Sequence, residues 1–140
     1  MINSRNIEDL QPLVADMCRS FISKCKDDGI DVIITSTYRD MESQEILYEQ
    51  GRTKPGRIVT NAKAGQSFHN YRCAFDFVPV IHGKAQWDDI ELISKCGEIG
   101  ESIGLTWAGR WKYFKELLHL QLSEKTLSQL QSEYRSNDVS

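Results

Sequence analysis

Apolar residues recur at helical spacing in several stretches, and capping residues mark where these stretches begin and end. The first helix is expected to begin at Pro12, because proline is tolerated in a first turn, and to end near Gly29 as a C-terminal cap. Asp40 is a good N-cap for a second helix that ends at Gly51, and Gly104 stops a third. The expected helices cover about 12–28, 40–50, 88–103 and a C-terminal stretch capped by Ser123.

Stretches of β-branched, aromatic or alternating residues predict the strands. Pro79 indicates that its strand ends at an edge of the sheet, because proline cannot donate a ladder hydrogen bond. Residues 52–66 show no period and are expected to form a long functional or mobile loop. The order of elements predicts an α+β fold, with helices packed against a small antiparallel sheet that carries the site. The expected strands are 31–38, 74–80, a short strand and turn at 105–111, and 118–122.

Length and composition indicate one domain over residues 1–140, with a core at about 12–134. A hydrophobic fraction of 40% and a charged fraction of 26% are typical of a soluble globular protein. The net charge of −3 argues against nucleic acid as a partner, since phosphate binding needs clustered Lys and Arg. The short basic run within 52–63 is interpreted as a solvated loop. The chain is expected to be a monomer.

No apolar run approaches the roughly 18 residues of a membrane span. The first residues also lack a basic region followed by an apolar one, so no signal peptide is expected. We therefore expect a protein made in the cytoplasm without stable membrane association.

The four cysteines contain no Cys-x-x-Cys pair, which makes a cysteine-type zinc site improbable. Cys18, Cys25 and Cys96 fall on apolar helix faces and are interpreted as reduced core thiols. Cys73 alternates with Asp76 along a strand, so its side chain is expected to pack on the opposite face rather than bind a metal.

Two short stretches supply the candidate chemistry. His69 and Asp76 lie seven residues apart where a loop becomes a strand, and His119 comes from a later strand with Glu116 just before it. Neutral imidazoles and a carboxylate are good zinc ligands, and three protein ligands leave a position for a reactive water. Glu116 is the candidate base for that water, and Arg39 the candidate partner for the developing oxyanion. Any one of these residues alone would more often be structural, so the hypothesis depends on their combination.

The pattern Ser67-x-His69-x6-Asp76, followed by Glu116-x-x-His119, resembles the M15 zinc peptidases. This family includes D-alanyl-D-alanine carboxypeptidases, vancomycin-resistance dipeptidases and phage endolysins that are L-alanyl-D-glutamate endopeptidases. The likeness is strongest to the endolysins and spans about residues 32–122. Its further motifs are 35–39, 47–53, 58–62, 65–71 and the tryptophans at 107 and 111. Arg72 stands where the family usually has glycine.

The resemblance implies a compact α+β fold and a zinc cofactor held by His69, Asp76 and His119. It implies Glu116 as the catalytic base and Arg39 as the group that polarises the carbonyl. Three further residues are expected to orient a ligand or contact substrate: Ser67, Trp107 and Gln121. His82, in contrast, is interpreted as a turn residue.

The function implied by the resemblance is hydrolysis of the L-Ala–D-Glu bond in bacterial peptidoglycan. The expected setting is host lysis by a phage or prophage endolysin that stays in the cytoplasm until a holin-like partner opens the membrane. One alternative is a carboxypeptidase or dipeptidase acting on D-Ala–D-Ala. Another, of a different class, is a zinc-stabilised binding module without catalysis.

Overall fold

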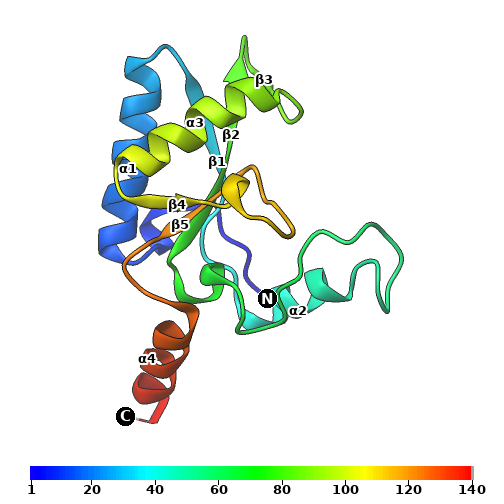
Figure 1. Ribbon diagram of the computed structural model, residues 1–140. Coiled ribbons are helices and arrows are strands. Elements are labelled where there is room, and N and C mark those ends of the chain that lie inside the picture. The colour runs from blue at the N-terminus through cyan, green and yellow to red at the C-terminus, as the bar shows by residue number, and fades with distance from the viewer. Residues whose placement is uncertain (140) are drawn as a thin grey trace.

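The computed structural model describes residues 1–139, and it has the α+β architecture expected from the sequence. Figure 1 shows helices α1 and α3 together on one side of a small sheet. The helices are α1 (Pro12–Asp27), α2 (Met41–Glu49), α3 (Ile90–Ser102) and α4 (Leu127–Val139). The strands are β1 (Asp31–Ser36), β2 (Ala74–Ile81), β3 (Lys84–Ala85), β4 (Leu105–Trp107) and β5 (His119–Leu122). Short 3-10 helices occupy Ile7–Asp9, Phe68–Tyr71 (η2) and Ala108–Arg110 (η3).

The described strands form one antiparallel sheet in the order β1-β2-β5-β4, with β3 paired to the far end of β2. β2 is the central strand, since its first half pairs with both β1 and β5. The β1–β2 pairing is irregular between Ile34 and Ser36, so that Ser36 lies opposite Asp76. This irregularity lies next to the predicted site and re-aims the end of β1 towards it.

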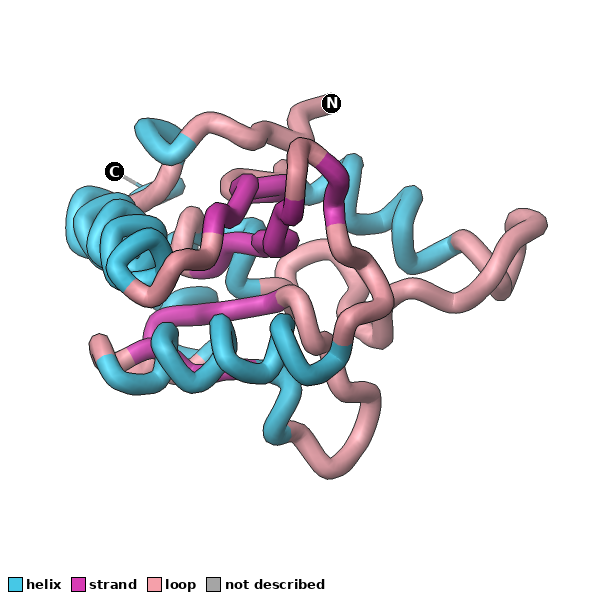
Figure 2. Tube along the Cα trace, turned by 90° about the horizontal axis from the view of Figure 1, so that it is seen from above, coloured by secondary structure: helices cyan, strands magenta, loops and turns pink. Residues whose placement is uncertain are grey.

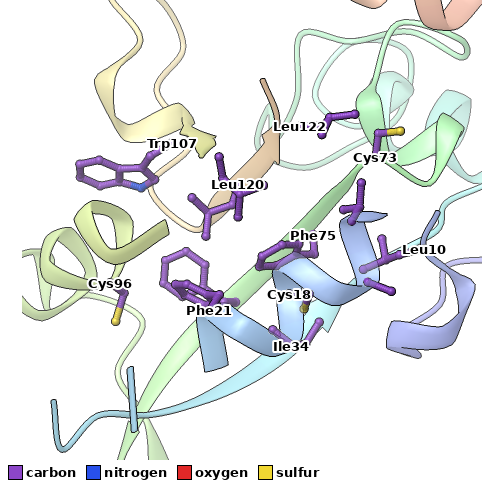
Figure 3. Packing of buried hydrophobic residues seen from close by; sticks show 14 of the residues in the cluster. Leu10, Cys18, Phe21, Ile34, Cys73, Phe75, Cys96, Trp107, Leu120 and Leu122 are labelled. Atoms are coloured by element: carbon purple, nitrogen blue, oxygen red, sulfur yellow. The ribbon is translucent and has the colours of Figure 1, made fainter. Parts of the chain in front are cut away.

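The hydrophobic core lies between the sheet and the helices α1 and α3. Figure 3 shows Phe21 of α1 and Phe75 of β2 pointing toward each other, and their ring centroids are 5.6 Å apart. Gly97 lets α3 approach the sheet, because a Cβ there would lie 2.2 Å from the indole of Trp107. Burial of apolar surface of this kind is the main favourable contribution to folding.

All four cysteines are free and buried, as the sequence predicts. Cys73 belongs to the core cluster and its thiol donates to Tyr71 O at 3.3 Å. Its interpretation as a packing residue is therefore confirmed.

The helix boundaries agree with the sequence except at the last helix. Asp40 and Asp89 cap α2 and α3 by accepting hydrogen bonds from the main-chain N–H groups of Ser43 and Leu92. The prediction that Ser123 caps α4 is wrong. Thr126 holds that position: its hydroxyl accepts from Gln129 N, while the Gln129 side chain accepts from Thr126 N. This reciprocal pair satisfies two otherwise free N–H groups, whereas the Ser123 hydroxyl is hydrogen-bonded to the Thr106 hydroxyl at 2.8 Å.

The strand around Pro79 is not an edge strand, which corrects the sequence prediction. Pro79 lies opposite Val32 in the β1–β2 ladder, and Pro79 O accepts from Gln86 N at 2.8 Å on the other side of β2. β5 has already ended there, so no ladder needs the missing proline N–H. The short strand β3 was not predicted, whereas the turn at His82 and Gly83 was, and both residues have positive φ.

The segment between α2 and η2 extends beyond the strands in both views (Figures 1 and 2), but several hydrogen bonds hold it to α2. Arg52 donates to Tyr48 O, Thr60 O and the Asn61 side chain at 2.7, 3.0 and 3.0 Å. Gln44 donates to Ala62 O at 2.7 Å. Among the described residues, no helix is long and apolar enough to cross a membrane.

Candidate metal centre

The structure brings together the three residues predicted as zinc ligands. His69, Asp76 and His119 each offer one donor atom, and these atoms all lie within 4.8 Å of one another. Asp76 Oδ1 is 3.1 Å from His69 Nε2 and 3.1 Å from His119 Nδ1. Both imidazoles are buried, and Asp76 is partly exposed towards the groove described below.

The sheet explains why residues so distant in sequence converge. Asp76 in β2 pairs directly with His119 in β5, so both side chains leave the same face of the sheet. His69 is carried by η2, whose main chain is joined to the end of β1 by the bond from Arg39 N to His69 O at 3.1 Å. Ser67 begins η2, with its hydroxyl accepting from His69 N at 3.2 Å.

The hydrogen bonds on the far side of each imidazole fit a metal. His69 Nδ1 donates to Thr37 O at 2.7 Å, and His119 Nε2 donates to Gln121 Oε1 at 2.8 Å. In the neutral rings, the nitrogens that face Asp76 therefore carry lone pairs. Three acceptors that point at one another repel unless a cation lies between them. Two imidazoles and a carboxylate match the donor preference of Zn²⁺.

The charges around the centre favour an ionised carboxylate. Burial by itself would raise the pKa of Asp76, but the two imidazoles hold it well below its usual value. Burial would likewise lower the pKa of His119, yet the hydrogen bond that the protonated ring would donate to Asp76, together with the charges of Asp76 and Glu116, raises it above the usual value. Asp76 is thus available as an anionic ligand at neutral pH.

Arg39 lies beside the three donors. Its Nη2 is 3.8 Å from Asp76 Oδ2, and its guanidinium donates to Gln44 Oε1 at 2.9 Å and Ser36 Oγ at 3.2 Å. Burial lowers the pKa of Arg39, and the charges of Asp76 and Glu116 offset this only in part. Because arginine is so strongly basic, the group stays a fixed cation at the site.

A cavity of about 360 Å³ opens over the donors and includes the predicted base. Glu116, Arg39 and Gln121 line it together with the three donors. Glu116 precedes β5 and is placed by two main-chain bonds: Glu116 N donates to Ala108 O, and His119 N donates to Glu116 O. All five residues predicted as ligands or catalytic groups therefore share one cavity.

The remaining predicted site residues divide into two groups. Ser67 and Gln121 contact the histidines, as described above, and both line the cavity. Trp107 is 5% exposed and lies in the core, so the structure does not bring it to the groove. Its indole N–H donates to Leu117 O at 2.8 Å. Leu117 follows Glu116, so this bond helps to position the main chain beside Glu116.

Thr37, Gln44 and Trp111 belong to the motifs of the resemblance, but their contacts at the site were not predicted from the sequence. The ring of Trp111 lies 5.8 Å from that of His119. Gln44 is fully buried and joins Arg39 to the loop at Ala62. A glutamine on the apolar side of α2 could have indicated a buried polar contact. The Thr37 contact is made by its main-chain carbonyl, so no pattern of side chains could predict it.

Arg72 lies away from the groove. It ends η2 with φ 63°, its guanidinium is 3.9 Å from the centre of the Tyr38 ring, and it donates to Asp9 O at 2.9 Å. These contacts hold an arginine in a backbone conformation that normally favours glycine.

Known proteins resemble this chain in sequence and in fold. A family model described as D-alanyl-D-alanine carboxypeptidase matches residues 60–122. The peptidoglycan L-alanyl-D-glutamate endopeptidase CwlK of Bacillus subtilis is 37% identical over 129 residues, covering 81% of this chain and 74% of CwlK.

Solved structures share the fold at lower sequence identity. The L-Ala D-Glu endopeptidase ChiX of Serratia marcescens has a TM-score of 0.65 at 18% identity, covering 87% of this chain and 89% of ChiX. The vancomycin-resistance D,D-pentapeptidase VanY, solved in complex with Zn(II), has a TM-score of 0.64 at 17% identity, covering 90% of this chain and 78% of VanY.

Proposed function

The chain belongs to the M15 family of zinc metallopeptidases, and on this premise we propose that it hydrolyses the L-Ala–D-Glu bond in the peptide stems of bacterial peptidoglycan. The observation that carries the choice of bond is the 37% identity to an L-alanyl-D-glutamate endopeptidase over most of both chains. The convergence of two imidazoles, one carboxylate, Glu116 and Arg39 on one cavity supports the hydrolytic chemistry.

In this proposal His69, Asp76 and His119 would hold the zinc, each through one donor atom. When bound, zinc lowers the pKa of water and polarises a carbonyl group. Thr37 and Gln121 keep the two imidazoles in the tautomers whose lone pairs face the metal. Arg39 contributes a fixed positive charge beside Asp76, where negative charge develops on the carbonyl oxygen during attack on the amide.

Glu116 acts as the proton carrier. Its carboxylate takes a proton from the attacking water and delivers it to the nitrogen of the leaving amine. Its position supports this role, because Glu116 lines the cavity above the donors and stays partly exposed.

Glu116→Gln tests this assignment. The variant keeps the shape of the side chain but cannot accept a proton, so the rate of stem-peptide hydrolysis should fall about 100-fold or more. Bound zinc, measured by elemental analysis, should stay at the wild-type level. Glu124→Gln, an exposed residue beyond β5, is the matched control and should retain activity. Undiminished hydrolysis by Glu116→Gln would exclude Glu116 as the base.

A second candidate function is cleavage of D-Ala–D-Ala, favoured by the description of the matching family model. Digestion of purified peptidoglycan and mass spectrometry of the products separate the two. Free stem peptides that begin at D-Glu, with L-Ala left on the glycan, support the endopeptidase. Released D-Ala, with the stems still attached, supports the carboxypeptidase.

The biological setting is a further part of the proposal. The resemblance to phage endolysins supports a role in host lysis, in which a holin gives the enzyme access to the wall. Expression in a sensitive bacterium should leave the cells intact until a pore-forming protein is co-expressed. Lysis without any membrane lesion would contradict holin dependence.

A further inference from the structure

Two further cavities, the flanks of the groove, adjoin the central one and share lining residues with it, and their linings differ in chemistry. Beyond the central cavity lie one of about 340 Å³ and another of about 450 Å³. Glu116 lines all three cavities, so the flanks meet at the proposed proton carrier. A bound peptide would therefore place the two sides of its scissile amide in different surroundings.

The first flank is aromatic. Trp111, Tyr113 and Phe114 line it, and Tyr113 is 79% exposed. Glu116 is the charged residue among its described lining residues, which include no lysine or arginine. Exposed aromatic rings offer a large contact area to apolar groups. This flank suits an uncharged part of a substrate.

The second flank carries two cations. Arg57 and Lys115 line it, together with apolar side chains such as Trp87 and Phe114, and Phe114 is shared with the first flank. Asp76 and Glu116 also border this flank, but Asp76 is engaged by the two histidines and Arg39. Among the described residues, neither Arg57 nor Lys115 forms a salt bridge. Their charges are thus available to an anionic ligand.

The main chain at Arg57 is fixed while its side chain is exposed. Gln50 Nε2 donates to Arg57 O at 2.9 Å. Gly51 has φ +82° and a Cβ there would lie 2.8 Å from Ile58 N, so glycine allows residues 57 and 58 to lie against it. The guanidinium is therefore presented from an anchored position at the groove.

We propose that Arg57, assisted by Lys115, binds a free carboxylate on the carbon next to the leaving nitrogen of the substrate. The inference deepens the proposed function and rests on it. In peptidoglycan stems D-Glu is joined onward through its side-chain carboxyl, so its α-carboxylate stays free beside the nitrogen that L-Ala acylates. An arginine fork matches a carboxylate in charge and geometry.

This placement sets the direction of the substrate in the groove. The D-Glu side occupies the cationic flank, and the L-Ala side, which continues to the glycan, occupies the aromatic flank. It also sets specificity, because stems whose D-Glu α-carboxylate is amidated to D-isoglutamine lose the charge that Arg57 binds.

The test compares two synthetic stem peptides that differ only in this group, one with D-Glu and one with D-isoglutamine. The zinc-loaded wild-type enzyme should cut the D-Glu peptide with a kcat/KM about tenfold higher, as expected for one charge-assisted contact. Arg57→Ala should bring the ratio close to one, mainly by raising KM for the D-Glu peptide. Lys115→Ala should reduce the ratio less.

Lys54→Ala is the matched control, because it removes a charge from the same exposed loop outside the cavity and should keep the wild-type ratio. Thermal unfolding checks that each variant is folded. A wild-type ratio of one, or an Arg57→Ala enzyme that keeps the wild-type ratio, would overturn the inference while endopeptidase activity persists. Failure of the proposed function would give a different result, because neither peptide would be cut at L-Ala–D-Glu. That result would contradict the inference as well.

Discussion

Thr37 and Gln121 perform the same task for two different histidines. Each offers a carbonyl oxygen to the imidazole nitrogen that faces away from Asp76. Thr37 does so through the main chain, where no substitution can remove the acceptor, whereas Gln121 does so through its side chain. The Gln121 contact is therefore the one that mutagenesis can test.

Gln121→Leu should weaken zinc binding about 10- to 100-fold, because the His119 ring loses the acceptor that fixes its orientation and tautomer. Competition with a chromophoric chelator measures the affinity. Gln86→Leu, which alters a glutamine next to β3, should bind zinc as the wild type does. Equal affinity in the two variants would show that packing alone orients His119.

Two buried thiols make stability dependent on pH. Burial raises the pKa of Cys18 to about 12 and that of Cys73 to about 11, from an ordinary value of 9.0. Above pH 9 the unfolded chain releases these protons while the folded chain retains them, so stability falls as the pH rises. At about pH 10 each thiol should cost roughly 1.4 kcal/mol.

Urea unfolding between neutral pH and about pH 10 measures this loss of stability. Replacing either thiol with alanine should make the alkaline loss smaller, whatever the variant does to stability at neutral pH. The same slope in the wild type and the variants would assign the loss to other groups.

The sequence predicted the residues of the site better than the contacts between them. His69, Asp76, His119 and Glu116 could be found because their residue types and spacing form a motif. The ion pair between Arg39 and Asp76 could not, since these two residues meet only through the pairing of β1 with β2.

At the scale of elements, the segment 52–66 is the one whose description changes most. It has no secondary structure of its own along most of its length, yet Arg52 and Gln44 hold it to α2 at Thr60, Asn61 and Ala62. The guanidinium of Arg52 also lies 3.9 Å from the centre of the Tyr48 ring. One wall of the groove is therefore held in place by the Gln44 side chain of α2 and by Arg52, which joins the segment to Tyr48 O of that helix.

Arg52→Met should loosen this wall. Each hydrogen bond lost is worth about 0.5–1.5 kcal/mol, so protease cleavage within 52–66 should accelerate about tenfold while the global unfolding temperature changes little. Limited proteolysis with mass spectrometry locates the cuts. Lys54→Met, in the same loop, is the control. Equal cleavage in both variants would show that Arg52 does not hold the loop.

The regular elements could be predicted to within a few residues because their local signals are strong. Pro12, Asp40 and Gly104 mark helix ends by their own chemistry. The cap of α4 and the place of β2 could not be settled in this way. Thr126 acts together with Gln129, and Pro79 is tolerated only because β5 ends before it.

At the scale of the whole molecule, the centre depends on how three parts of the chain meet. β2 supplies Asp76, β5 supplies His119, and η2 supplies His69 against the end of β1. The sequence predicts the identity of these donors, but their convergence is a property of the sheet order β1-β2-β5-β4, which no local pattern contains.

Removal of zinc should therefore destabilise the whole fold rather than one loop. A ligand that binds only the folded state stabilises it by about 2.7 kcal/mol when its free concentration is 100 times its Kd. Thermal unfolding with added zinc and with a chelator should show this difference. His119→Ala should unfold at the same temperature under both conditions. A zinc-dependent shift in that variant would place the metal elsewhere.

The direct pairing of Asp76 with His119 has a consequence for assembly of the protein. A slip of one residue between β2 and β5 would turn one of the two side chains to the opposite face, and the three donors would no longer meet. Zinc binding therefore favours molecules in which β2 and β5 are paired in the correct register. Chains with the wrong strand register would not bind zinc and would be inactive. Peptidoglycan hydrolysis would therefore come only from molecules with the correct pairing.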